Sequence, residues 1–319
     1  MTIALTADSR PIVAHRTLQA FEECVAVDQG AAYRVNLGRV LPHLQDAYDG
    51  GTFPFRSHMG ASLMGGECGR KIWYSWRWHK RPAHKGQLLR LFNRGHLEEG
   101  RLIALLITAG IRVWQTGPDG KQFRISGGRG HYGGSGDGVA AGVPDIPEGY
   151  YALLEFKTHS EKSFNKVKEE GVRAAKFEHY AQMQQYLKKM NLFYALYIAV
   201  NKNNDEIYAE IVPLDNFTAV QMIDRAELLV DSIGAPDKIA KTAGDFRCKW
   251  CDYKEICHFK SEPDKNCRSC RYSNPGQDGK WFCHKNLLPD DIAFNGGEDV
   301  GKELDKDAQL AGCEHWEQV

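Results

Sequence analysis

The sequence predicts an α/β protein with a mixed central sheet flanked by helices and a small cysteine-rich tail. Short apolar runs bounded by Gly, Pro, Asn and Asp, which are typical of strands, alternate with longer stretches whose apolar residues recur at the helical period. Seven of the nine cysteines lie beyond residue 247, among polar and turn-forming residues. A chain of 319 residues has room for about two domains. We expect an N-terminal extension over residues 1–55, a core over 56–260 and a tail over 261–319.

The individual elements follow from the hydrophobic pattern and from the turn residues between the apolar runs. The expected helices lie around Leu37–Leu44, Leu102–Ile107, Phe177–Leu187 and Asn216–Ile233. The expected strands are Ile111–Gln115, Gln122–Ile125, Ser135–Val143, Tyr150–Lys157, Leu192–Asn201 and Glu206–Val212. The Asn203-Asn204-Asp205 segment indicates a hairpin turn between the last two strands, and Asp290–Asp307 is expected to be an acidic loop.

Two adjacent strands of this pattern carry an acid, an acid and a lysine. Side chains alternate between the faces of a strand, so Glu155 and Lys157 point to the same side. A hairpin whose loop centres on Ile146 or Pro147 would place Asp137 opposite Glu155 or Lys157, on that same face. A slip of one residue in the register would turn Asp137 away and destroy the arrangement.

These three groups indicate a metal-dependent phosphodiester hydrolase. Mg²⁺ and similar cations such as Mn²⁺ prefer carboxylate and carbonyl oxygens, so Asp137, Glu155 and the Phe156 carbonyl offer an open site. The cation would polarise the scissile phosphate and lower the pKa of a bound water. Lys157 would orient that water and stabilise the developing charge. The alternative is that these are solvated charges on the exposed face of a hairpin.

The neighbouring helices carry further polar residues at helical spacing. Gln182 and Tyr186 are four residues apart, and therefore lie on one face of a helix. His96 and Glu99 are one turn apart on the helix that precedes the sheet, although a lone helical histidine is more often an ordinary satisfied residue than a ligand. Asp145 lies in the turn after Pro144, away from Glu155, and we expect no catalytic role for it.

With these residues in this order, the chain resembles the PD-(D/E)XK nuclease superfamily, which has a restriction-endonuclease-like core. Within it the chain resembles the RecB-like exonucleases, including iron–sulfur members such as the AddB and CRISPR-adaptation nucleases, over about residues 60 to 260. The resemblance implies an active site formed by His96, Asp137, Glu155, Lys157, Gln182 and Tyr186. It implies that His96, Asp137, Glu155 and Phe156 hold the Mg²⁺ or Mn²⁺. Proteins of this kind are common in bacteria and their phages.

The resemblance implies a DNA exonuclease that acts on ends or single-stranded flaps in recombination, repair or degradation. The chain has no Gly-x-x-x-x-Gly-Lys-Ser/Thr motif, so we expect a partner such as a helicase, a recombination protein or a single-strand-binding protein to unwind DNA. Two alternatives are a structure- or site-specific endonuclease and a non-catalytic DNA-binding scaffold. The presence of Asp137, Glu155 and Lys157 together favours an enzyme.

Nine cysteines without a recognisable signal peptide favour a reducing compartment and metal ligation over disulfides. Cys248, Cys251 and Cys257 follow the core and Cys68 precedes it, in a segment that looks like the first helix of the family's core. This split resembles the four-cysteine [4Fe–4S] cluster of the iron–sulfur nucleases, which would clamp the two ends of the domain. Zinc is the alternative, because it also accepts four thiolates, and Cys68 could also be simply a buried apolar residue.

A second set of cysteines predicts a Zn²⁺ site in the tail. Cys267 and Cys270 form a Cys-x-x-Cys pair, Cys283 follows thirteen residues later, and Cys313 lies near the end. The tail is too small and polar to fold without such a staple. His284 or His315 could replace one thiolate, because each lies close to a candidate cysteine. Cys24 has no partner in this pattern and is expected at an apolar position.

Charge and aromatic residues indicate where nucleic acid would bind. The 41 basic and 41 acidic residues balance, so the whole chain does not attract a polyanion. Between Gly69 and Leu97, however, eight Lys or Arg and no carboxylate alternate with tryptophan and tyrosine, which suits a path for single-stranded DNA. The expected DNA contacts are Arg70, Lys71, Arg77 and Arg94, with Arg268, Arg271 and Lys280 as further phosphate contacts in the tail. The alternative is that the tryptophans are core residues.

The pattern predicts no membrane association. The longest apolar runs, Leu102–Ile111 and Leu192–Val200, are too short to span a bilayer, and the first eight residues are too short for the apolar region of a signal peptide. We therefore expect a cytoplasmic protein, located in the host cytoplasm if a phage encodes it.

Overall fold

The structure is a computed structural model that describes residues 11–40, 55–84, 86–287 and 301–319. The chain forms two compact units that are interleaved along the sequence. The first unit comprises Met1–Gly50, His84–Arg124 and Ser135–Ala219. The second unit comprises Gly51–Ala83, Ile125–Gly134 and Val220–Val319. The chain crosses between the units five times, after residues 50, 83, 124, 134 and 219, whereas the sequence predicted three consecutive regions with boundaries near residues 55 and 260.

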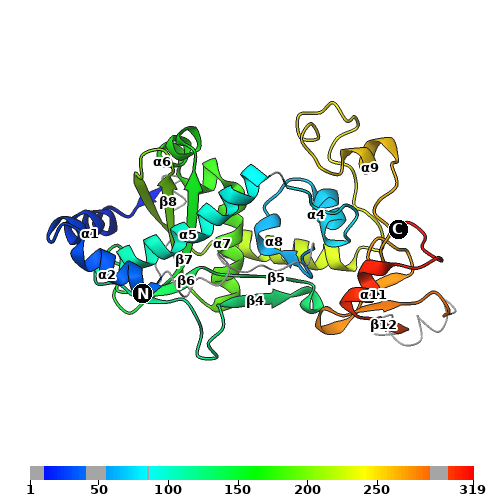
Figure 1. The fold of residues 1–319 in the computed structure, drawn as a ribbon, viewed down its shortest axis with the longest axis horizontal. Coiled ribbons are helices and arrows are strands. Elements are labelled where there is room, and N and C mark those ends of the chain that lie inside the picture. Colours follow the sequence, from blue (N-terminus) through cyan, green and yellow to red (C-terminus); the bar gives the residue numbers. More distant parts are fainter. Residues whose placement is uncertain (1–10, 41–54, 85, 288–300) are drawn as a thin grey trace. The chain divides into compact units, whose positions relative to one another are not determined.

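A six-stranded sheet forms the centre of the first unit (Figure 1). Its strand order is β1-β9-β8-β7-β6-β3, with β7 and β8 parallel and all other neighbours antiparallel. The mixed α/β architecture expected from the sequence is therefore confirmed. The strands are β1 (Ile12–Val13), β3 (Arg112–Trp114), β6 (Gly138–Ala141), β7 (Tyr151–His159), β8 (Tyr194–Asn201) and β9 (Ile207–Pro213).

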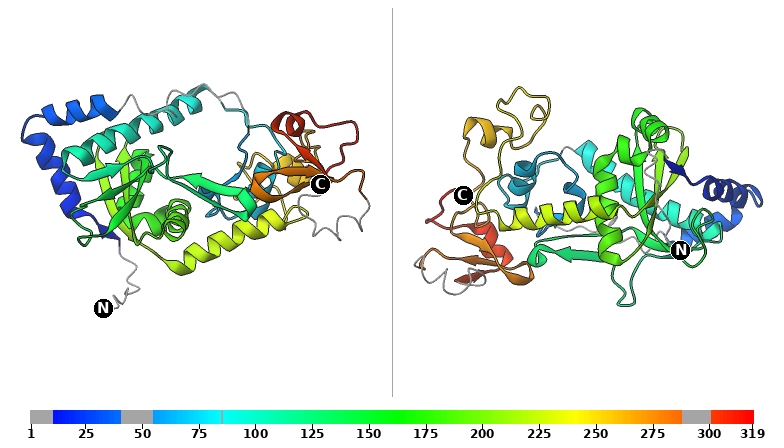
Figure 2. Two further views of the ribbon diagram at one scale, coloured as in Figure 1. Left: turned by 90° about the horizontal axis from the view of Figure 1, so that it is seen from below. Right: turned by 180° about the vertical axis from the view of Figure 1, so that it is seen from behind.

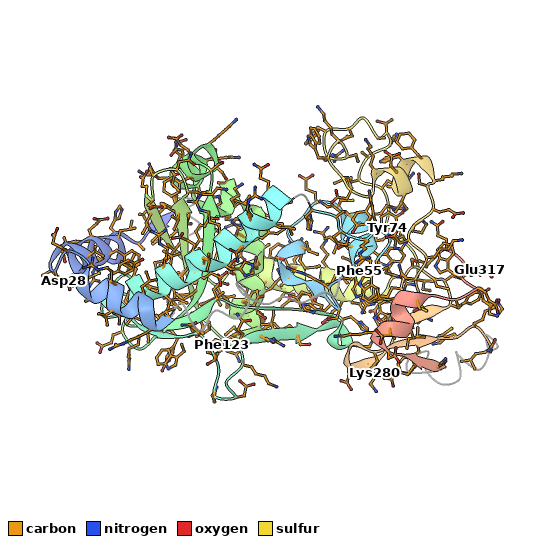
Figure 3. All side chains as sticks on the ribbon, viewed as in Figure 1. Asp28, Phe55, Tyr74, Phe123, Lys280 and Glu317 are labelled. Atoms are coloured by element: carbon orange, nitrogen blue, oxygen red, sulfur yellow. The ribbon has the colours of Figure 1, made fainter. Side chains whose placement is uncertain are left out.

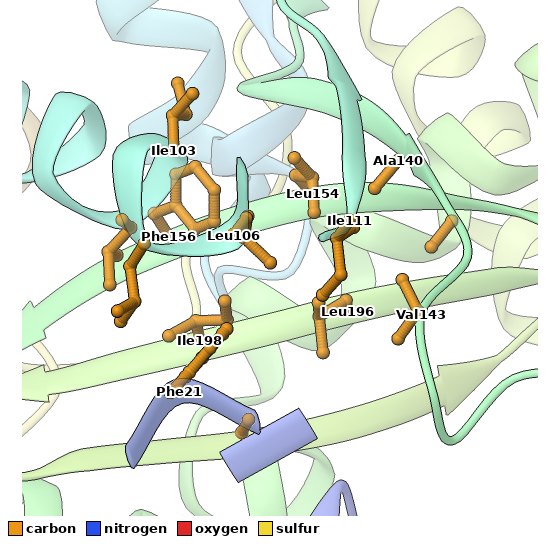
Figure 4. Packing of buried hydrophobic residues seen from close by; sticks show 14 of the residues in the cluster. Phe21, Ile103, Leu106, Ile111, Ala140, Val143, Leu154, Phe156, Leu196 and Ile198 are labelled. Carbon is orange, nitrogen blue, oxygen red and sulfur yellow. The ribbon is translucent and has the colours of Figure 1, made fainter. Parts of the chain in front are cut away.

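Helices pack on this sheet because one face of each strand is apolar. Leu154 and Phe156 of β7 and Ile198 of β8 contribute to a buried cluster with Phe21 and Ile103 (Figure 4). The first two helices therefore complete the core of the first unit. The helices of this unit are α1 (His15–Ala26), α2 (Ala31–Val40), α5 (Gly86–Thr108), α6 (Glu161–Ala175) and α7 (Phe177–Met190). Of the expected helix Leu37–Leu44, residues 41–44 lie outside the described residues.

The β6–β7 hairpin has one of the two registers that the sequence left open. Gly138 pairs with Leu154 and Ala141 with Tyr151, so the loop centres on Ile146. The expected strand Ser135–Val143 is split in two, because β5 ends at Ser135 and β6 begins at Gly138. The predicted turn between β8 and β9 is confirmed by the hydrogen bond from the Asp205 backbone N–H to the Asn201 carbonyl, 2.8 Å long.

Two small sheets and several helices form the second unit (Figure 2). The first sheet has the order β2-β5-β4 and the second the order β10-β11-β12. The strands are β2 (Met59–Gly60), β4 (Arg124–Gly127), β5 (Tyr132–Ser135), β10 (Ser273–Pro275), β11 (Trp281–Cys283) and β12 (Lys302–Leu304). The helices are α4 (Gly69–Trp76), α8 (Asn216–Asp231), α9 (Lys254–Phe259) and α11 (Lys306–Ala311).

The last part of the chain is more regular than the sequence predicted. Residues 290–300 of the expected acidic loop lie outside the described residues. Beyond them, β12 pairs with β11, and Asp305 caps α11 by accepting a 2.8 Å hydrogen bond from the Ala308 N–H. The expectation of a loop up to Asp307 is therefore wrong for its last residues, because strand pairing and a helix cap order them.

Aromatic side chains fill the core of the second unit. Trp73, Trp76 and Trp78 are buried, and Phe55 stacks on Trp78 with ring centroids 4.8 Å apart. Figure 3 shows Phe55 and Tyr74 among the side chains of this region. The alternative that the tryptophans are core residues is thus the correct one. Within the described residues, no helix is both long enough and apolar enough to cross a bilayer.

Candidate active site

Glu155 and Lys157 lie side by side on one face of β7. Glu155 is only 1% exposed, and the Lys157 Nζ donates a hydrogen bond to the Glu155 Oε1. The same Nζ lies 3.2 Å from the Phe156 carbonyl oxygen. Because Leu154 and Phe156 belong to the apolar cluster on the opposite face, strand alternation requires Glu155 and Lys157 to face away from that cluster.

Asp137 joins this pair from the neighbouring strand. It precedes Gly138, whose partner is Leu154, so the hairpin register places Asp137 beside Glu155. The Asp137 Oδ2 accepts a hydrogen bond from the Phe156 N–H at 2.8 Å. The structure therefore brings Asp137, Glu155 and Lys157 together, as we expected from the sequence.

A glycine is required next to Asp137. Gly138 has a φ of +152°, and a Cβ at this position would lie 2.9 Å from the carbonyl oxygen of Trp114. Any other residue would push β3 away from β6, because backbone atoms cannot yield as a flexible side chain can. The close approach of β3 to this glycine holds the strand that carries Asp137.

Helix α7 places two further predicted residues at the site. The Gln182 Nε2 donates to the Glu155 Oε2 at 3.1 Å, so both oxygens of this carboxylate have a hydrogen-bond donor. One turn later, the Tyr186 OH donates to the Ser135 carbonyl at 2.9 Å, two residues before Asp137. Gln182 thus orients Glu155, and Tyr186 holds the segment that leads into Asp137.

Helix α5 brings charge from a third direction. The charge of His96 favours a lower pKa of Asp137, and the charge of Glu99 favours a higher pKa of Lys157, so both helical residues lie near the site. Within the described residues, the His96 Nδ1 is buried without a hydrogen-bond partner. Glu99 was not predicted as a site residue, although its position one turn after His96 was a signal for it.

Burial controls the protonation of the site. Burial raises the pKa of Glu155 to about 7, and the charge of Asp137 raises it too, whereas Lys157 opposes the shift. Burial also raises the pKa of Asp137. Burial alone would lower the pKa of Lys157, but Glu155 and Asp137 outweigh burial and raise this pKa. The pKa values of Asp137 and Glu155 are both raised, so a cation bound beside them would favour their ionised forms.

The donor chemistry fits a hard divalent cation. The buried Glu155 carboxylate, the half-buried Asp137 carboxylate, a backbone carbonyl and an unpartnered imidazole nitrogen are ligand types that such ions accept. Within the described residues, no three His, Cys, Asp or Glu side chains are already gathered around one metal position. A cation would therefore have to draw Asp137 and Glu155 together and displace the Lys157 ammonium from Glu155.

Three residues that sequence reasoning missed extend the polar face. The Tyr197 OH lies 2.9 Å from the His159 Nε2 and 3.1 Å from the His179 Nδ1. Tyr197 pairs with Glu155 across the parallel strands, His159 lies two residues after Lys157, and His179 lies three residues before Gln182. Burial lowers the pKa of His159 to about 4 and of His179 to about 3. The strand and helix spacings were signals for them.

The first cysteine set lies in the second unit, and none of the nine cysteines forms a disulfide. Cys68, Cys248, Cys251 and Cys257 together line a cavity of about 400 Å³, a volume that includes its open mouth. The Cys68 Sγ accepts a hydrogen bond from the Lys71 N–H at 3.4 Å at the start of α4. Arg70, Lys71, Lys238 and Arg247 line the same cavity. A cavity with four thiols and a cationic lining fits a [4Fe–4S] cluster, which carries thiolate charge.

The second cysteine set also lies in the second unit. The Cys270 N–H donates to the Cys267 carbonyl at 3.1 Å, which closes the Cys-x-x-Cys turn. Burial raises the pKa of Cys267 to about 11, and the charges of Cys313, Cys270 and Cys283 raise it as well. Cys24, by contrast, packs against the apolar cluster of the first unit, as the sequence predicted.

The predicted DNA contacts are placed in different environments. Arg77 is buried, and its guanidinium donates to three backbone carbonyls, so the expectation that it contacts DNA is wrong. Arg70 donates to the carbonyls of Ala235 and Pro236. Lys71 is exposed, and Arg94 is exposed while donating to the Lys202 carbonyl. Arg77 is therefore a structural residue, whereas most of the other described cations of this stretch are exposed, namely Lys71, Lys80, Arg81, Arg90 and Arg94.

The other predictions on charged residues have mixed outcomes. Asp145 accepts hydrogen bonds from the Arg16 N–H at 3.1 Å and the Thr17 N–H at 2.7 Å, so its carboxylate holds the start of α1. This capping role accounts for an aspartate in the turn without a catalytic function. Arg268 is buried and cannot serve as a phosphate contact, whereas Arg271 and Lys280 are exposed and form ion pairs with Glu317 and Glu303.

Comparisons with known proteins give distant structural likenesses. No family model and no curated protein matches the chain. The chain is similar to the crystal structure of an alkaline exonuclease from Laribacter hongkongensis, with 12% identity, a TM-score of 0.38, and coverage of 55% of this chain and 86% of that one. The complex of that exonuclease with dAMP gives 10% identity, a TM-score of 0.39 and the same coverages of 55% and 86%. The crystal structure of SSO0001 gives 14% identity, a TM-score of 0.38, and coverage of 69% and 95%.

Proposed function

We propose that the first unit is a divalent-cation-dependent DNA nuclease of the PD-(D/E)XK type, and that it acts as an exonuclease. The observation that carries the proposal is the meeting of Asp137, Glu155 and Lys157 around the backbone of Phe156. Gln182 supports it, because it engages the second oxygen of Glu155. Solvated charges on an exposed hairpin would lie in water. Glu155 is instead buried, has a raised pKa and accepts a hydrogen bond from the Gln182 side-chain amide.

The residues have separate roles in the proposed reaction. Asp137, Glu155 and the Phe156 carbonyl would hold Mg²⁺ or Mn²⁺, with His96 as a further ligand. When bound, such a cation polarises the scissile phosphate and lowers the pKa of water. Lys157 keeps its proton, since its pKa is raised, and presents a positive charge where negative charge develops in the transition state. Gln182 keeps Glu155 oriented through the hydrogen bond to its Oε2.

The substrate is proposed to be DNA with free ends or single-stranded flaps, in recombination, repair or degradation within a reducing cytoplasm. We expect a helicase, a recombination protein or a single-strand-binding protein to present such ends. Cleavage should be measured on end-labelled linear DNA and on closed circular DNA with Mg²⁺, with Mn²⁺ and with a chelator. Loss of linear DNA alone supports the exonuclease, cutting of the circle indicates an endonuclease, and no cleavage of either contradicts the enzyme.

The chain offers a matched control for the catalytic ion pair. Lys168 and Glu206 form an exposed ion pair 2.6 Å long, with the same residue types as Lys157 and Glu155. Glu155→Gln and Lys157→Met should each abolish metal-dependent cleavage, whereas Glu206→Gln and Lys168→Met should cleave as the parent does. Equal activity in all four variants would show that the cleavage comes from elsewhere.

A [4Fe–4S] cluster is proposed for the second unit, held by Cys68, Cys248, Cys251 and Cys257. The shared cavity and its cationic lining support this proposal. Cys68 comes from the start of α4 and the other three ligands from the segment around α9, so the cluster would link chain segments far apart in sequence. After anaerobic purification, iron and sulfide in equal amounts are expected. Zinc without iron would assign this set to a zinc site instead.

A further inference from the structure

Two arginines are buried in the second unit. Arg77 follows the last residue of α4, and Arg268 lies inside the Cys267–Cys270 turn; each is 2% exposed. Arginine is rarely buried to this extent without a charged partner, because removing its guanidinium from water is costly. Two of them within one small core therefore require an explanation.

Arg77 is bound to the backbone of the cysteine turn. Its Nε donates to the Arg268 carbonyl at 2.7 Å. Its Nη2 donates to the Cys270 carbonyl at 2.9 Å and to the Ser273 carbonyl at 3.0 Å. All three acceptors are neutral, so these bonds position the guanidinium against the turn without cancelling its charge.

Arg268 lies against the aromatic core. Its Cζ is 4.0 Å from the ring centroid of Trp78 and 4.7 Å from that of Trp281. The Cζ of Arg77 is 5.1 Å from the same Trp281 ring. The Arg268 Nε donates to the Gln309 Oε1 at 2.8 Å, and its Nη1 donates to the Trp76 carbonyl at 3.2 Å. Tryptophan faces offset part of the cost of burying a cation, but they supply no full negative charge.

Negative charge close to these arginines can come from thiolates. In the described part of the chain, neither Arg77 nor Arg268 pairs with a carboxylate; the ion pairs found there all involve other residues. Cys270 is 5% exposed, and its carbonyl oxygen accepts a hydrogen bond from the Arg77 Nη2, so a thiolate at Cys270 would belong to the same buried turn as this guanidinium. Four thiolates around one Zn²⁺ leave a net charge of two negative units, since four minus two is two. Two buried guanidinium groups match that charge.

We propose that Cys267, Cys270, Cys283 and Cys313 bind one Zn²⁺ as four thiolates, and that Arg77 and Arg268 are the buried counter-charges of this site. The proposal is independent of the nuclease proposal. It also explains why α4, which is far from the tail in sequence, ends in an arginine that reaches the cysteine turn. The arginines position and balance the site and are not metal ligands.

The charge balance and the strand geometry favour four cysteines over three cysteines and a histidine. A site with one histidine would carry one negative charge less and would leave one guanidinium unmatched. Cys283 ends β11, and His284 follows it, so their side chains point to opposite sides of the strand. The His284 Nδ1 lies 3.0 Å from the Asn274 Nδ2, and its Nε2 is buried without a hydrogen-bond partner among the described residues. His315 is exposed beside Glu314, with 3.6 Å between its Nε2 and the Glu314 Oε1.

The first test measures the metal and its ligands in the full chain. The protein should be purified with ZnCl₂ present, and its zinc content determined after removal of free metal. About one zinc per chain is expected at the second cysteine set, with loss of this zinc in Cys267→Ser, Cys283→Ser and Cys313→Ser. Cys24→Ser and His315→Ala should retain it. Replacement by Co²⁺ should give the absorption of tetrahedral cobalt with thiolate ligands. Zinc retained in Cys313→Ser but lost in His315→Ala would overturn the four-thiolate assignment.

The second test measures the counter-charge through zinc affinity, by competition with a chelator of known affinity. Arg77→Met and Arg268→Met should each bind zinc roughly 10-fold to 100-fold more weakly. Arg77→Lys, which keeps the charge, should recover part of the affinity. Arg271→Met removes an exposed arginine from the same segment and should bind zinc as the parent does. Should a Met variant not fold, the Lys variant and its zinc-dependent gain in Tm remain measurable. Unchanged zinc affinity in the Met variants, or equal loss in Arg77→Lys, would overturn the proposal.

Discussion

The carboxylate of Asp137 accepts the backbone N–H of Phe156 at 2.8 Å, on the residue that separates Glu155 from Lys157. This one bond ties the acid that precedes β6 to the strand that carries the other acid and the lysine. Glu155 and Lys157 lie within β7, whereas Asp137 lies just before β6 and is held by its side-chain bond to the β7 backbone. A site built on paired strands tolerates little movement, which suits a reaction that needs a cation and a phosphate in fixed positions.

Replacing Asp137 and Asp145 separately should give opposite results. Asp137→Ala should lower the rate of metal-dependent cleavage at least about 100-fold, with little change in Tm, because it removes a buried ligand and charge. Asp145→Ala should keep the cleavage rate but lower the free energy of unfolding by about 1 kcal/mol, since this carboxylate caps α1. Denaturant unfolding and the cleavage assay together check both. If Asp145→Ala lost cleavage and Asp137→Ala kept it, Asp145 and not Asp137 would be the catalytic aspartate.

Metal affinity should depend on pH. The pKa of Glu155 is raised to about 7 by burial and by Asp137, and a cation binds the carboxylate and not the acid. Protons therefore compete with Mn²⁺ below this pKa, so the apparent affinity for Mn²⁺ should rise between about pH 6 and about pH 8 and then level off. Raising the metal concentration should shift the midpoint of the activity profile to lower pH. A midpoint that does not move with metal concentration contradicts this prediction.

Gln182 should act through Glu155. Gln182→Ala removes the donor to the Glu155 Oε2 and should lower kcat roughly 10-fold to 100-fold while the fold is retained. Gln182→Glu should be at least as harmful, because it places a third carboxylate against a buried one. Gln19→Ala, on the exposed face of α1, is the matched control, since the Gln19 Nε2 also donates to a glutamate, at 2.7 Å. If Gln19→Ala and Gln182→Ala lose the same activity, the effect of Gln182 is not local.

Cys68 should be required for the iron centre. Cys68→Ala removes the ligand that comes from the start of α4, so we expect the variant to lose iron, sulfide and visible absorption. Cys24→Ala should keep all three, because Cys24 packs in the first unit. Iron analysis and the absorption spectrum of anaerobically purified protein decide between the outcomes. Full iron content in Cys68→Ala would remove Cys68 from the ligand set.

Two glycines should respond oppositely to alanine. Gly138→Ala should lower the free energy of unfolding by about 1–3 kcal/mol, because its φ is +152° and a Cβ would meet the Trp114 carbonyl. Gly38→Ala lies inside α2 with no atom within 4 Å of the added Cβ, so it should raise the free energy of unfolding by about 0.5–1 kcal/mol. Urea unfolding of both variants checks the pair. A stable, active Gly138→Ala would show that β3 can shift.

Local patterns predicted the hairpin and its register. Turn residues placed the centre of the loop at Ile146 or Pro147, and strand alternation then predicted that Asp137, Glu155 and Lys157 share a face; the structure has the loop centred on Ile146. The same period-2 pattern also contained His159, and helical spacing contained His179, yet neither was selected. Histidines are common on the polar faces of strands and helices. What sets His159 and His179 apart from ordinary histidines is that both rings contact the Tyr197 hydroxyl, which only the structure shows.

The cationic stretch shows where local reasoning failed. Trp76, Arg77 and Trp78 have the composition of a nucleic-acid path, but they are buried against residues about two hundred positions later in the chain. No property of the stretch itself reveals that Arg268 and Trp281 will cover it. The same is true of the interleaved units, because a chain that leaves a unit and returns gives no compositional break at each crossing.

The amino-acid sequence by itself determined the strand and helix types, the face on which each acid lies and the grouping of the cysteines, since these depend on periods and spacings of a few residues. Only the tertiary structure decided which arginines are buried, that Asp145 caps α1, and that Gln182 engages Glu155. Burial and long-range contact depend on which distant segments pack together, and packing is a property of the whole chain.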